Sequence, residues 1–70
     1  MIKFTFLGFE YQTNEDASRV EALGANGSVT RTGSARVRDA ALLALSVEAA
    51  RKLGMPKLAN FRARKLRELK

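Results

Sequence analysis

The sequence predicts an α+β fold, in which a small antiparallel sheet of two or three strands packs against one core helix and a second, basic helix follows. Three observations support this class. The first residues alternate apolar and polar side chains, Asp39–Leu53 is apolar over most of its surface, and Asn26-Gly27 is a strong hairpin signal. We expect 70 residues to form a single small domain over 1–70, with 56–70 as a basic helical extension.

Residues 2–11, IKFTFLGFEY, are predicted to form the first strand. The apolar alternation begins on even-numbered residues and continues on odd-numbered ones after Leu7-Gly8, so we expect a bulge or kink there. The residues of this alternation are Ile2, Phe4 and Phe6 on one face, and Leu7, Phe9 and Tyr11 on the other. Because the chain has few aromatic residues, we expect those of this strand to lie in the core.

The segment 14–23 allows two interpretations. Asn14 could cap a short helix that ends at Gly24, or 18–24 could be a strand. Asn26-Gly27 favours the strand, because a type I′ hairpin turn needs a positive φ at both central residues and Asn-Gly supplies it. The resulting register pairs Ala22 with Arg31 and Val20 with Gly33.

Residues 28–37, SVTRTGSARV, are predicted to form the return strand of this hairpin. Small hydroxyl side chains and one arginine would share a face of it, namely Thr30, Thr32, Ser34 and Arg36. Such a face suits contacts with phosphate oxygens, and it equally suits an ordinary solvated sheet face.

The core helix is predicted over 38–53, and its main apolar stripe follows the helical period. That stripe comprises Leu42, Leu45, Ala49 and Leu53. Alanines occupy the opposite side of its first half, so more than one side of this helix should be covered. Gly54 should end the helix in a left-handed conformation, and Pro56 suits the first turn of a second helix over 56–69. The apolar arc of the second helix comprises Leu58, Phe61, Leu66 and Leu69.

The composition excludes several chemistries. The chain has no cysteine and no histidine, which rules out disulfides, Cys/His zinc sites and histidine-assisted nucleophiles. We therefore expect a protein that is not an enzyme and needs no cofactor. The N-terminus is a poor signal peptide, and the longest apolar run, Ala40–Leu45, is too short to span a membrane, so a cytoplasmic protein is expected. The small size leaves a homodimer open.

The positive charge is concentrated at the C-terminal end. Residues 1–50 hold five basic and six acidic side chains, whereas residues 51–70 hold eight basic side chains and one acidic one. This asymmetry predicts a polyanionic partner, either a nucleic acid or an acidic protein surface. An anionic membrane surface is disfavoured, because the last helix has four large apolar residues and no tryptophan. The residues expected to contact phosphates are Arg62, Arg64, Lys65 and Arg67, with Arg36 and Arg38 in a secondary role.

The stretch TGSARVRDAALLAL resembles the strand-to-helix junction at the end of double-stranded-RNA-binding domains. The three-strand-plus-helix arm-binding domains of phage integrases are similar as well. Arg36-Val37-Arg38 stands where the RNA-binding family has a lysine pair, and the strand IKFTFLGF stands where it has its N-terminal helix. The resemblance implies a compact strand-hairpin-helix unit that contacts nucleic acid.

In size, basicity and lack of a catalytic constellation, the chain also resembles small accessory proteins of phages and mobile elements, such as anti-CRISPR inhibitors. Some of these proteins cap a nucleic-acid-binding surface of a larger complex. The leading hypothesis is a small nucleic-acid-binding accessory protein that contacts phosphates through its C-terminal helix. The alternative is an inhibitor or subunit that docks on an acidic or nucleic-acid-binding surface of a larger complex.

Overall fold

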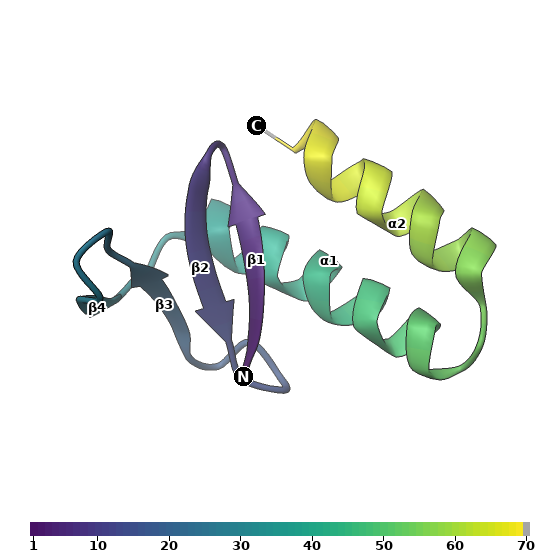
Figure 1. Cartoon of the computed structure of the whole chain (residues 1–70), viewed down its shortest axis with the longest axis horizontal. Coiled ribbons are helices and arrows are strands. Elements are labelled where there is room, and N and C mark those ends of the chain that lie inside the picture. The colour runs from purple at the N-terminus through teal and green to yellow at the C-terminus, as the bar shows by residue number, and fades with distance from the viewer. Residues whose placement is uncertain (70) are drawn as a thin grey trace.

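The computed structural model describes residues 1–69 and combines a four-stranded antiparallel sheet with two helices (Figure 1). The elements are β1 (Ile2–Phe6), β2 (Phe9–Thr13), β3 (Val20–Leu23), β4 (Val29–Arg31), α1 (Ala35–Lys52) and α2 (Pro56–Glu68). The strands pair in sequence order, so β1 and β4 form the two edges. α1 packs on one face of the sheet, and α2 returns along α1. The α+β class is confirmed, with four strands instead of two or three.

A two-residue turn divides the segment that was predicted as one strand. Phe6 pairs with Phe9, and the two residues between them, Leu7 and Gly8, have φ angles of 52° and 82°, as a type I′ turn requires. Such a turn places the residues that flank it on the same face of the sheet. The apolar alternation therefore changes from even to odd positions because the chain reverses, and the prediction of a single bulged strand over 2–11 was wrong.

The helix-facing side of the sheet carries the aromatic core. Phe4 and Tyr11 pair across β1 and β2, with their ring centroids 5.5 Å apart in a stacked arrangement. Phe4 and Phe6 are buried, and Thr13 at the end of β2 is fully enclosed. Phe9, next to the hairpin turn, is 68% exposed, so the expectation of a core position is wrong for this residue.

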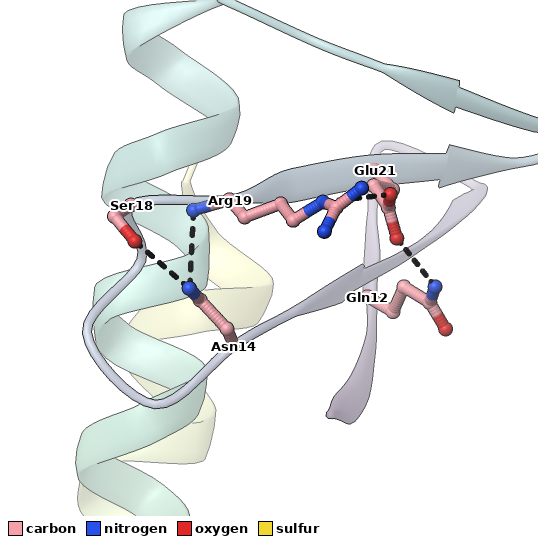
Figure 2. A network of polar contacts seen from close by, with 5 residues as sticks. All are labelled: Gln12, Asn14, Ser18, Arg19 and Glu21. Atoms are coloured by element: carbon pink, nitrogen blue, oxygen red, sulfur yellow. Dashed lines mark hydrogen bonds and ion pairs between the residues drawn. The ribbon is translucent and has the colours of Figure 1, made fainter.

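Residues 14–19 form a loop that the Asn14 side chain closes from within (Figure 2). The Asn14 Oδ1 atom accepts a hydrogen bond from the Arg19 N–H at 3.1 Å, and the Asn14 Nδ2 atom donates to the Ser18 hydroxyl at 2.8 Å. These contacts use the side chain of Asn14 in a loop instead of a helix cap. β3 then begins at Val20, so the helix alternative for 14–23 is wrong.

The second hairpin has a three-residue loop instead of the type I′ turn predicted at Asn26-Gly27. The Gly24 N–H donates to the Ser28 carbonyl at 2.7 Å, and within the loop only Gly27 has a positive φ, at 84°. This geometry is a type I turn followed by a left-handed glycine. The observed register pairs Glu21 with Arg31, Ala22 with Thr30 and Leu23 with Val29. The predicted pairs, Ala22 with Arg31 and Val20 with Gly33, were therefore shifted by one residue.

The boundary between the last strand and α1 lies earlier than predicted. β4 ends at Arg31, and α1 starts at Ala35 because Ser34 is its N-cap, whose hydroxyl accepts a hydrogen bond from the Val37 N–H at 3.4 Å. The predicted boundary between a strand over 28–37 and a helix over 38–53 was therefore several residues too far along the chain. The strand face expected from Thr30, Thr32, Ser34 and Arg36 does not form, because Arg36 lies in the first helical turn.

α1 buries its alanine and valine side. The buried residues of this helix are Val37, Ala40, Ala41, Ala44, Val47 and Ala50. From the predicted leucine stripe, Leu45 packs against the core, whereas Leu42 is 45% exposed and Leu53 is 74% exposed, so the stripe lies in the core only in part. Small side chains allow the backbone of α1 to approach the sheet and α2 closely. Because protein interiors are densely packed, the helix buries the side whose small residues fit the available space.

The corner between the helices follows the local sequence signals. Gly54 has a φ of 70°, and its N–H donates to the Arg51 carbonyl at 3.1 Å. The Met55 N–H donates to the Ala50 carbonyl at 2.9 Å, which completes a Schellman motif at the end of α1. Pro56 then occupies the first turn of α2, where its missing N–H leaves no helical bond unmade.

Replacing Leu7 by asparagine should stabilise the protein. Leu7 is 56% exposed and holds a left-handed φ, which costs a residue with a branched side chain about 1 kcal/mol, whereas asparagine tolerates it. Urea unfolding should show a gain approaching that amount for Leu7→Asn. The matched control is Leu7→Ala, which removes the side chain but keeps the strained Cβ. Equal stability of the two variants would contradict the assigned turn.

Enlarging the buried side of α1 should destabilise the fold more than trimming its exposed side. Ala41 is 0% exposed, so Ala41→Leu should cost about 1–3 kcal/mol by overpacking. Leu42→Ala, on the exposed side, should cost no more than about 0.5 kcal/mol. Thermal and urea unfolding of both variants compare the two sides directly. The opposite order would restore the predicted leucine core.

Candidate nucleic-acid interface on α2

The packed side of α2 determines which of its residues face solvent. Ala59 is buried in a cluster with Val47 and Ala50 of α1. Leu66 and Leu69 reach the larger cluster between α1 and the sheet. The residues of this packed side are Leu58, Ala59, Arg62, Ala63, Leu66 and Leu69. Since α2 is held along one side over its whole length, its other side is presented outward in a defined orientation.

Arg62 belongs to the packed side. Its Nη1 atom donates a hydrogen bond to the backbone carbonyl of Ser46 in α1 at 3.3 Å, and the residue is half-buried. The Ser46 hydroxyl donates in turn to the Leu43 carbonyl at 2.7 Å. The guanidinium of Arg62 therefore joins the two helices, and the structure separates it from the other arginines that were predicted to contact phosphates.

The outward side of α2 forms a surface that we call the basic face. It consists of Lys57, Phe61, Arg64, Lys65 and Arg67, all of which are exposed. Phe61 lies one helical turn from Lys57 on one side and from Arg64 and Lys65 on the other, because residues three and four apart are neighbours on a helix. Glu68, the one carboxylate of α2, is exposed as well and lies one helical turn after Arg64 and Lys65, so this face carries four cations and one carboxylate and is positive.

Phe61 is the feature of the basic face that the sequence prediction placed wrongly. Its ring is 56% exposed, and the Lys65 ammonium lies 5.4 Å from the ring centroid, within the range of a cation–π interaction. The other residues of the predicted apolar arc, Leu58, Leu66 and Leu69, do pack, and Ala59 and Ala63 complete the packed side without Phe61. The helical spacing of residues 57, 61, 64 and 65 could have indicated a basic face with an aromatic centre. Because this spacing was not used, Lys57 was not among the predicted contacts.

The two arginines at the start of α1 point to different parts of the molecule. Arg36 lies eleven residues before Val47 and therefore on the stripe of α1 that faces α2, at the end of α1 toward which α2 returns. Arg38 lies beside the β2–β3 loop, where its positive charge contributes to lowering the pKa of Asp16 after the larger effect of hydrogen bonds from Ser18. The structure thus places Arg36 on the side of α2 and Arg38 away from it.

The outer face of the sheet has a mixed charge pattern. Lys3, Gln12, Glu21 and Arg31 lie in register across the four strands. The Gln12 Nε2 atom donates to a Glu21 carboxylate oxygen at 2.7 Å, and the other oxygen pairs with Arg19 Nε at 3.3 Å (Figure 2). Because Glu21 offsets the nearby cations, this face is a weaker attractor for a polyanion than the basic face.

Comparison of the chain with protein families, with curated proteins and with solved structures found no match in any of the three. Across residues 1–69, no helix is both long enough and apolar enough to cross a membrane. Within the same range, the acidic side chains do not form any group of three that could hold a metal ion.

Removing the interhelical contact should affect stability more than removing a cation of the basic face. Arg62→Ala deletes a hydrogen bond and the packing of a half-buried stem, so it should cost about 1–2 kcal/mol in urea unfolding. Arg64→Ala, at an exposed position two residues away, should change the stability by less than about 0.5 kcal/mol. Equal losses would show that Arg62 does not join the helices as described.

Proposed function

We propose that this protein binds nucleic acid through the basic face of α2, with phosphates contacted by Lys57, Arg64, Lys65 and Arg67. The observation that carries the proposal is an exposed aromatic ring, Phe61, set among these cations. Proteins that bind single strands combine a positive surface that follows the backbone with aromatic side chains on which bases stack. The basic face offers both elements on one rigid helix.

The placement of charge supports an electrostatic mode of binding. Lysine and arginine side chains that neutralise phosphates release condensed counterions, and this release provides most of the affinity in sequence-independent binding. Backbone contacts of this kind position a protein without selecting a base sequence. The proposed function is therefore that of an accessory protein with broad sequence tolerance, without an enzymatic step.

The aromatic centre favours nucleic acid over an acidic protein surface, and single strands over duplexes. An acidic protein surface would pair with the four cations, but it would have no flat group to stack on the face of the Phe61 ring that Lys65 does not cover. Bases in a duplex are stacked on each other, so their faces are open to an aromatic side chain only in single strands or unstacked sites. Arg62 and Arg38, predicted as contacts, are not part of the proposed surface, and Arg36 is a secondary contact.

Binding should depend on salt in proportion to the four cations of the basic face. For single strands, four phosphate contacts give a slope of about −3 in a plot of log affinity against log salt concentration. Fluorescence anisotropy with random-sequence DNA and RNA oligomers measures this slope. Lys65→Ala should reduce its magnitude by roughly 0.7, and Lys3→Ala on the sheet should leave it unchanged. A slope near zero for the full chain would exclude the proposal.

Removing the Phe61 ring should weaken single-strand binding without a change in charge. Loss of one stacked base corresponds to about 1–3 kcal/mol, so Phe61→Ala should lower the affinity by roughly fivefold or more. Leu42→Ala removes a comparably exposed apolar side chain from α1 and is the matched control. If both variants bind a single strand as the parent does, the aromatic part of the proposal fails. Binding to an acidic protein but to no oligomer would favour the alternative function.

A further inference from the structure

β1 is an edge strand with hydrogen-bonding groups that point away from the sheet. It pairs with β2 alone, and its two-residue turn makes Phe6 and Phe9 a hydrogen-bonded pair. The alternation of an antiparallel ladder then directs the N–H and C=O groups of Lys3 and Thr5 outward. Among residues 1–69, these backbone groups make no hydrogen bond to another element.

A groove runs along this edge between β1 and the two helices. Its lining combines consecutive residues of β1, from Ile2 to Thr5, with side chains of α1 and α2. The lining residues of the helices are Ala44, Val47, Glu48, Arg51, Ala63 and Leu66. The wall opposite the strand therefore combines apolar side chains, from Ala44 to Leu66, with the charged Glu48 and Arg51, and its alanines and valine leave room for side chains of an added strand.

The other edge of the sheet has no such groove. β4 has only three residues, all of them exposed, and no helix lies along it as α1 and α2 do along β1. An extended segment on β4 would gain backbone hydrogen bonds alone. On β1 it would gain backbone hydrogen bonds and bury alternate side chains against the helices, which is how strand addition provides both affinity and specificity.

We propose that the open edge of β1 binds an extended segment of another protein as a fifth strand. The segment alternates apolar residues, which face α1 and α2, with acidic residues on the outer side of the sheet, where Lys3 lies. Arg51 of α1 lines the groove on the helix side and adds to the positive charge at this edge. The charge around the groove argues for this partner: both cations are exposed, and they outnumber Glu48. Charge also argues against a second copy of this chain, because each copy carries a net charge of +6 and like charges would meet across the new pair.

The test uses the full chain and a fluorescent nine-residue peptide in which valine and glutamate alternate, with a valine–lysine peptide as its matched control. Anisotropy should show binding of the glutamate peptide only. Amide hydrogen exchange measured by NMR then locates the contact. On binding, the exchange of the Lys3 and Thr5 N–H groups should slow by about tenfold or more. The N–H groups of Ile2 and Phe4 are already bonded to β2, so their exchange should change little.

Two pairs of variants separate the groove from general electrostatics. Arg51→Glu should weaken the glutamate peptide about fivefold or more, while Lys52→Glu, the same change one residue away and outside the groove, should have an effect of less than about twofold. Thr5→Pro removes an outward N–H at a position where an edge strand tolerates proline, and Thr5→Val keeps that N–H. Only the proline variant should lose peptide binding, with its fold verified by circular dichroism.

Several results would overturn the proposal. Equal binding of the lysine peptide, no slowing of exchange at Lys3 and Thr5, or equal effects of Arg51→Glu and Lys52→Glu would each exclude strand addition with an acidic partner. Light scattering that shows a dimer, with these amides already protected without peptide, would identify a second copy as the occupant. The outcome is independent of nucleic-acid binding, because Lys65→Ala should leave the peptide affinity unchanged.

Discussion

The close packing of small side chains on α1 is the constraint on which the rest of the structure depends. Ala40 and Ala41 are fully buried on the side of α1 that packs in the main core, and Ala50 of α1 packs with Ala59 of α2. Because the α1 side of these contacts carries only alanines, the aromatic side chains of the sheet, Phe4 and Phe6, pack directly against the helix and a core forms from few residues. Leu42 and Leu53 of α1 are left exposed, and α2 packs through its alanines and leucines with the cations of the basic face turned outward.

Features that depend on neighbouring residues in the chain were predictable from the sequence. Gly54 and Pro56 mark the corner between the helices because a left-handed C-cap and a proline at the first turn are local requirements. The strand over 18–24 and the hairpin after it were recognised from turn chemistry. The turn types were exchanged, however: Leu7 adopts the positive φ expected only of residues such as glycine or asparagine, and Asn26 does not. Pairing across the sheet overrode the local preference at Leu7.

Features that depend on packing between elements were not predictable in the same way. Hydrophobicity ranks leucine above alanine, so a stripe of leucines was preferred, whereas the space between α1 and the sheet selects the alanines. The same bias placed Phe61 in the core and missed Lys57. The concentration of charge did identify Arg64, Lys65 and Arg67, but only the contact with the Ser46 carbonyl distinguishes Arg62 from them.

The result is a small protein with two surfaces of different chemistry. The basic face of α2 concentrates cations around an exposed ring, while the outer sheet pairs Glu21 with Arg19 and Gln12 and remains mixed in charge. The groove beside β1 instead presents the free N–H and C=O groups of Lys3 and Thr5, opposite a wall of apolar side chains with Glu48 and Arg51. A protein that bound a nucleic acid on one helix and a strand of another protein on its sheet edge would link the two molecules.

The most direct test of the proposed nucleic-acid surface is a residue-resolved NMR titration of the full chain with a short single-stranded oligomer. We expect the largest shifts at the ring protons of Phe61 and at the side chains of Lys57, Arg64 and Lys65. The exposed side of α1 around Leu42 should remain unchanged. Shifts centred on Arg38 or on the outer sheet face, with the Phe61 ring unaffected, would contradict the account.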